Sequence, residues 1–204
     1  ELGRLDEAMT SFHKALAIKP DYAEAHTHLG NALKEADQLE DAAASHEKAI
    51  RLKPDLAEAH NNLGVALQEL GKLDEAVASY HKALAIKPDY AEAHSNLGVA
   101  LQKLGKLDEA VTSHHKALAI KPDYVQAHYN LGNVLKDLGR LDEAVASYNK
   151  ALAIKPDYAT AHSNLGVALQ ELGKLDEAVA SYNKALAIKP DYAEAHSNLG
   201  VALQ

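Results

Sequence analysis

The chain has 204 residues and a formal net charge of −8, which disfavours binding to nucleic acid or to anionic lipid surfaces. Cysteine is absent, so disulfide bonds and thiolate metal sites are excluded. No apolar run approaches the roughly 18 residues that cross a bilayer, and no signal sequence is present, so we expect no membrane insertion and favour a cytoplasmic location.

Proline recurs every 34 residues, always within Lys-Pro-Asp and nowhere else. A fixed period of this length is typical of stacked repeat architectures. We therefore interpret 1–204 as a single array that opens in mid-repeat, as expected for a piece of a longer protein. In chain order it comprises a half unit at 1–22, complete units at 23–56, 57–90, 91–124, 125–158 and 159–192, and a half unit at 193–204.

Each unit is predicted to be a hairpin of two helices, here called helix A and helix B. In unit 57–90, a first apolar stripe at helical spacing is His60, Leu63, Gly64, Leu67 and Leu70. Asp55 is expected to cap this helix and Gly71 to end it in a left-handed turn. A second stripe begins near Leu73 and must stop before Pro88, because the residue preceding proline is disfavoured in helical geometry.

Glycine also lies inside helix A, at Gly64 and its equivalents. An interior glycine costs a helix about 1 kcal/mol relative to alanine, so it needs a reason. We expect Gly64 to face Ala76 and Ala83 of helix B, where the absence of a side chain lets the two backbones approach closely.

The pattern His60-x-x-Leu63-Gly64-x-x-Leu67, followed by Ala76-x-x-x-Tyr80-x-x-Ala83 and Pro88, resembles the tetratricopeptide repeat. This resemblance covers the whole chain. It implies an all-α, right-handed superhelical solenoid of antiparallel helix hairpins, with the A helices lining a concave groove. It also implies a protein-interaction scaffold without catalytic residues or cofactors. One departure is that histidine replaces the family's usual tryptophan, at His26, His60, His94, His128, His162 and His196.

Asparagine recurs two residues after most of these histidines, at Asn62, Asn96, Asn130, Asn164 and Asn198. A carboxamide offers donors and an acceptor that match a peptide bond, so such a ladder is suited to hold an extended peptide. It is similar to the asparagine ladder in the repeat domain of O-GlcNAc transferase. The alternative roles are bonding to the neighbouring helix and simple exposure to solvent. Further candidates for the groove are Asn61, Tyr129, Asn133 and Lys136.

The charge of the expected groove favours a neutral or basic protein or peptide as partner. Repeat domains of this family that clamp a terminal carboxylate place Lys or Arg on helix A. Here Glu24, Glu58 and Glu92 occupy such places, and Lys34, Lys103 and Lys136 are the nearby cations. A carboxylate clamp would therefore lack its charge-assisted donors.

The 12 histidines do not predict a metal or catalytic site. Stacking separates the helix A histidines by about 10 Å, whereas zinc–nitrogen bonds are about 2 Å long. We expect these side chains to pack in place of tryptophan. Ser, His and Asp recur as the same surface set in every unit, so no unit holds a distinct catalytic constellation.

The two half units predict a second kind of interaction. Residues 1–22 present Leu5, Met9 and Phe12 without a helix A, and residues 193–204 present His196, Leu199 and Leu203 without a helix B. Together they make one complete unit, so we expect head-to-tail self-association, which does not close on itself. Two further interpretations stay open. The chain is a substrate-presenting region of a larger glycosyltransferase, or it is an engineered or self-assembling array without a natural ligand.

Overall fold

The computed structural model describes residues 2–204, with the side chains of the first two of these left aside. Within this range the chain forms twelve α-helices, and the described residues contain no β-strand. The helices belong to two compact bodies, each larger than a 34-residue repeat. The first unit of the structure ends at Leu104 and the second unit begins at Gly105. The all-α helical repeat that the family resemblance implies is confirmed.

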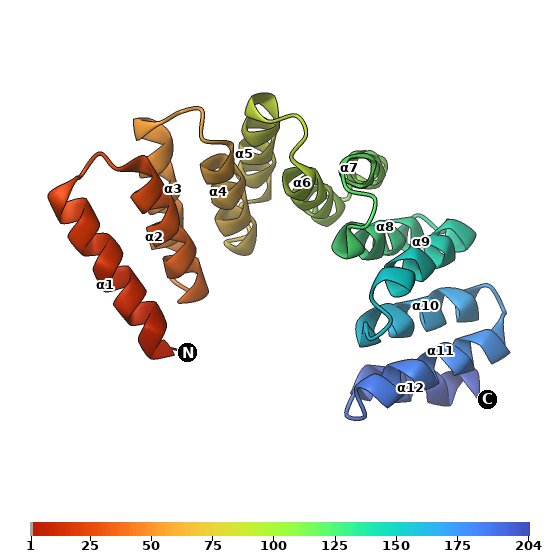
Figure 1. The fold of residues 1–204 in the computed structure, drawn as a ribbon. Coiled ribbons are helices and arrows are strands. Elements are labelled where there is room, and N and C mark those ends of the chain that lie inside the picture. Colours follow the sequence, from red (N-terminus) through yellow and green to blue (C-terminus); the bar gives the residue numbers. More distant parts are fainter. Residues whose placement is uncertain (1) are drawn as a thin grey trace. The chain divides into compact units, whose positions relative to one another are not determined.

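The first unit contains α1 (Leu2–Ile18), α2 (Ala23–Glu35), α3 (Leu39–Leu52), α4 (Ala57–Glu69), α5 (Leu73–Ile86) and α6 (Ala91–Lys103). The second contains α7 (Leu107–Ile120), α8 (Val125–Asp137), α9 (Leu141–Ile154), α10 (Ala159–Glu171), α11 (Leu175–Ile188) and α12 (Ala193–Ala202). Even-numbered helices are A helices and odd-numbered helices are B helices. Within each unit, consecutive helices pack side by side and run in opposite directions (Figure 1).

The turn inside each hairpin needs a left-handed residue. Gly71 has φ 77° and Gly139 has φ 73°, as the sequence predicts for the residue after helix A. Asp37 takes this place between α2 and α3 and adopts φ 59°. Aspartate is among the few residues other than glycine that tolerate this conformation, so the divergent hairpin keeps its turn.

The start of helix A differs from the sequence prediction. The N-cap of α4 is Leu56 rather than Asp55, and no side chain caps this helix. The aspartate lies one residue too early, inside the loop. The prediction of a capping aspartate is therefore wrong.

A histidine–proline hydrogen bond fixes this loop instead. The Nε2 atom of His60 lies 3.0 Å from the carbonyl oxygen of Pro54, and that of His128 lies 2.8 Å from the same atom of Pro122. A carbonyl only accepts, so Nε2 carries the proton in the neutral ring. The Nδ1 atoms of both rings are buried without a partner. The predicted packing role is confirmed for the buried histidines, His60, His94, His128 and His162, but not for His196, which is exposed. The imidazole N–H supplies a donor as an indole would.

The interior glycines of helix A face aromatic rings. A Cβ atom added to Gly64 would lie 2.6 Å from Cε1 of Tyr80, and one added to Gly132 would lie 2.5 Å from Cε1 of Tyr148. Both tyrosines have 0% exposure. The expectation that Gly64 faces alanines is therefore wrong, because the large ring of helix B fills the space between them.

Candidate functional site

In the first unit, side-chain amides link the A helices to one another. The Nδ2 atom of Asn62 on α4 donates to Oδ1 of Asn31 on α2 at 2.9 Å. The Nδ2 atom of Asn96 on α6 donates to Oδ1 of Asn61 on α4 at 3.1 Å. Asn61 also donates to Asn62, at 3.1 Å, and is itself buried. The ladder thus forms a polar seam between neighbouring A helices, as the alternative interpretation of the sequence states.

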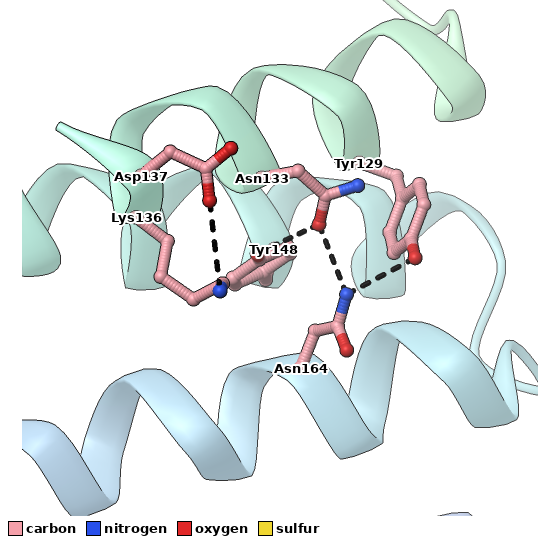
Figure 2. Close-up of polar contacts among 6 residues, drawn as sticks. All are labelled: Tyr129, Asn133, Lys136, Asp137, Tyr148 and Asn164. Atoms are coloured by element: carbon pink, nitrogen blue, oxygen red, sulfur yellow. Dashed lines mark hydrogen bonds and ion pairs between the residues drawn. The ribbon is translucent and has the colours of Figure 1, made fainter. Parts of the chain in front are cut away.

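The second unit replaces this seam with a larger cluster between α8 and α10. Asn164 on α10 donates through Nδ2 to the hydroxyl of Tyr129 at 3.0 Å and to Oδ1 of Asn133 at 2.9 Å, both on α8. Figure 2 shows Asn164 reaching up between these two residues. Because an amide nitrogen has two hydrogens, these bonds leave Asn164 only its carbonyl oxygen for a ligand.

The hydroxyl of Tyr148 joins the same cluster from α9. It donates to Oδ1 of Asn133 at 2.9 Å, so this oxygen accepts two hydrogen bonds (Figure 2). Burial raises the pKa of Tyr148, so the phenol stays protonated and remains a donor. Lys136 lies at the end of the cluster and pairs with Asp137 at 3.7 Å.

Tyr129 presents an aromatic surface beside these polar groups. Its ring centroid lies 4.9 Å from that of Tyr158 and 6.1 Å from that of Tyr148, with tilted planes. Burial raises the pKa of Tyr129. The hydroxyl accepts a bond from Asn164, so its own proton remains for an acceptor. The cluster therefore offers a phenolic donor, an amide carbonyl and a half-exposed ring on one face.

The remaining predicted groove residues are placed differently from one another. Asn130 is buried, and its Oδ1 accepts a bond from Nε2 of Gln126 at 2.9 Å. Asn198 is half-buried on α12. The structure thus gathers Tyr129, Asn133 and Asn164, with Lys136 beside them. Gln126, Tyr148 and Tyr158 were not among the predicted groove residues, although Gln126 differs from the glutamate found in several repeats at that register.

The half hairpins expose positions that complete hairpins cover. Gly200 on α12 has no atom within 4 Å of an added Cβ, whereas Gly166 faces the ring of Tyr182. Leu203 is 68% exposed, whereas the equivalent Leu169 is 4% exposed. His196 is exposed and Leu199 half-buried, as are Leu5, Met9 and Phe12 on α1.

In the described range, no three His, Asp or Glu side chains gather as metal ligands would. Of the helices described, none has the length and apolar character that a bilayer crossing requires.

Comparison with known families decides what kind of array this is. A TPR repeat model matches residues 1–37, 30–71, 69–105, 101–139, 132–173 and 169–204. The chain belongs to the tetratricopeptide repeat (TPR) family. No curated protein matches it in a sequence search. The resemblance to O-GlcNAc transferase accordingly stays a prediction.

Solved TPR structures resemble the chain over most of its length. YrrB, described as a TPR protein with an unusual peptide-binding site, is 26% identical with a TM-score of 0.72, covering 91% of this chain and 96% of YrrB. MamA is 28% identical with a TM-score of 0.73, covering 81% of this chain and 97% of MamA. The APC/C hetero-tetramer Cut9–Hcn1 matches at 20% identity and a TM-score of 0.87, over 100% of this chain and 40% of that one, and shows the fold alone.

Proposed function

We propose that this TPR chain is a protein-interaction scaffold that acts by binding rather than by catalysis, and that an extended peptide binds along its A-helix face. The peptide-binding site named for YrrB supports the general role. The observation that carries the proposal is the cluster of Tyr129, Asn133 and Asn164. Its phenolic proton suits a peptide carbonyl, and the Oδ1 atom of Asn164 suits a peptide N–H.

The amide seam of the first unit supports the same role. Asn62 and Asn96 each use one of two amide hydrogens in the bond to the preceding A helix. Each therefore keeps a second hydrogen for a peptide carbonyl. A peptide held through its main chain would be bound without close reading of its side chains.

The partner is neutral to basic. Exposed acids on the A helices include Glu58, Glu69 and Glu171, and Lys136 is paired with Asp137. Added salt screens charges separated by about 8–10 Å or more. Binding of a lysine-containing peptide should therefore weaken as the salt concentration is raised. A binding constant that does not change with salt concentration would contradict this part of the proposal.

The test is a peptide array followed by titration of the selected peptides. Tyr129→Ser introduces serine, the residue found at the same position of the next repeat as Ser163. The variant chain should therefore fold and should bind the peptide more weakly. Tyr129→Phe keeps the ring and removes only the hydroxyl. Asn183→His is the matched control, because it exchanges one exposed B-helix residue for its counterpart at His81. Equal affinity of the wild-type chain and Tyr129→Ser for every selected peptide would reject the site.

Head-to-tail association of two copies is a second candidate function. The open space at Gly200 corresponds to the place that a tyrosine ring fills against Gly64, Gly132 and Gly166, and that the His46 ring fills against Gly30. Phe12 on α1 stands at the register of Tyr80 and is half-buried, whereas Tyr80 has 0% exposure. Sedimentation should show an average molecular mass that increases with protein concentration, and Phe12→Glu should abolish this increase. A constant monomer mass up to millimolar protein would exclude this candidate.

A further inference from the structure

The B-helix side of the second unit contains two clefts of the same design. The first, of ≈ 580 Å³, lies between α7 and α9 over α8, and the second, of ≈ 560 Å³, lies between α9 and α11 over α10. Equivalent residues line both. Leu131 and Leu165 form the floors, and Ile154 and Ile188 stand at the edges. These isoleucines are 42% and 40% exposed, which leaves an apolar surface open on this side.

A low ridge separates the two clefts. Ala153 on α9 lines both of them. It is exposed and carries only a methyl group. The distance of closest approach between helices depends on the side chains at the contact, so a partner backbone can cross α9 closely at this alanine.

The charge beside the clefts is positive. Lys150 lines the first cleft and Lys184 the second. Neither forms an ion pair with another part of the chain that the structure describes. Glu143 also lines the first cleft, but both of its carboxylate oxygens accept bonds from Arg140 at 2.7 Å. Its charge is thus already matched, and a lysine remains beside each cleft for a partner's carboxylate.

We propose that these two clefts form a second docking surface, which takes an amphipathic acidic helix of a partner protein. Successive hairpins are spaced by about 10 Å. Two residues seven apart on a helix are separated by about 10.5 Å on one side of it. One aliphatic side chain therefore enters each cleft while the helix crosses Ala153, and flanking carboxylates pair with Lys150 and Lys184. This surface differs from the A-helix face in both position and partner charge.

The test uses a synthetic helical peptide with leucines seven residues apart and glutamates beside them. Binding is followed by fluorescence anisotropy and by methyl NMR of the full chain. We expect shifts at Ile154 and Ile188, and about tenfold weaker binding after Lys150→Glu with Lys184→Glu, since attraction becomes repulsion. Lys103→Glu with Lys72→Glu is the control, because it makes the same change of charge on exposed residues of the first unit.

Three further measurements sharpen the result. Ala153→Leu fills both clefts from an exposed position and should abolish binding without lowering the melting temperature. A peptide with lysines in place of the glutamates should bind at least about tenfold more weakly. Leucines five residues apart should also bind more weakly, because they cannot enter both clefts.

The proposal is overturned if the lysine peptide binds as tightly as the glutamate peptide, or if the control reversal weakens binding as much as the cleft reversal. It is also overturned if the methyl shifts occur away from Ile154 and Ile188. Self-association in the absence of peptide that is lost in Ala153→Leu would assign the clefts to a second copy of the chain instead.

Discussion

Tyr148 donates its phenolic hydrogen to Oδ1 of Asn133 at 2.9 Å, although the equivalent tyrosines bond to a glutamine. Tyr182 donates to Oε1 of Gln170 at 3.0 Å. In repeat 125–158 the position of this glutamine is held by Lys136, whose ammonium group can only donate hydrogen bonds. Asn133 stands at the position that Val167 occupies in the next repeat. The two substitutions on α8 therefore act together, since one removes the acceptor and the other restores it.

This pairing predicts a strong dependence of Asn133→Val on its background. Alone, the change leaves the buried Tyr148 hydroxyl without an acceptor and should lower the free energy of unfolding by about 1–3 kcal/mol. With Lys136→Gln, the pattern of unit 159–192 is restored and most of the loss should be recovered. Denaturant unfolding of the two single variants and the double variant measures the coupling. Strictly additive effects would contradict the pairing.

The contact between Gly132 and the Tyr148 ring predicts opposite outcomes for two identical substitutions. Gly132→Ala places a methyl group against a fully buried ring and should destabilise the chain by about 1–3 kcal/mol. Gly200→Ala meets no atom within 4 Å and should stabilise α12 by up to about 1 kcal/mol through helix propensity. Thermal unfolding monitored by circular dichroism compares them. A stabilising Gly132→Ala would show that the ring moves aside at little cost.

Much of the fold follows directly from the sequence because each unit repeats the same local signals. The 34-residue period, the stop before proline and the turn glycine fix the hairpins, and α5 spans Leu73–Ile86 as predicted. Asp55 does not cap helix A, because the loop is fixed instead by a hydrogen bond that His60 donates to the carbonyl oxygen of Pro54, six residues earlier. A bond over that separation leaves no mark in helical periodicity.

The candidate site was only partly predictable. The register of the asparagines places them on helix A, but it does not show which amide hydrogens bond to the neighbouring helix. Asn164 uses both of its hydrogens, whereas Asn62 uses one. That difference depends on Tyr129 and Asn133, which lie 35 and 31 residues away from Asn164. Only the packing of α8 against α10 brings these residues together.

Two buried histidines predict a loss of stability in mild acid. His46 and His114 have 0% exposure, and burial lowers the pKa of each to about 4. Both ring nitrogens of each lack a partner. Lys34 opposes the charging of His46, and His115 that of His114. Between about pH 7.5 and 4 the folded chain thus binds fewer protons than the unfolded chain, so stability falls as the pH drops through this range.

The size of this effect is about 3 kcal/mol for each histidine near pH 4, and it vanishes above about pH 7.5. His46→Tyr should remove the part of this pH dependence that His46 causes, because the new ring would lie against Gly30 as Tyr148 lies against Gly132. Its hydroxyl would reach Asn31, the register equivalent of Asn133. Unfolding free energies at pH 7.5 and 5 compare the variant with the wild-type chain. Equal pH slopes for both would refute the assignment.

The histidine–proline bond predicts a position-dependent cost for removing the imidazole donor. His128→Phe deletes a bond of 2.8 Å to the Pro122 carbonyl and should lower stability by about 1 kcal/mol, since the ring is buried. His26→Phe deletes the same bond to Pro20 at 3.0 Å, where the ring is half-exposed and water replaces the donor. Its cost should be smaller. Hydrogen exchange at the start of α8 should rise in His128→Phe, because the loop that precedes this helix is no longer anchored. Unchanged exchange there would show that ring packing, rather than the bond to proline, holds the loop.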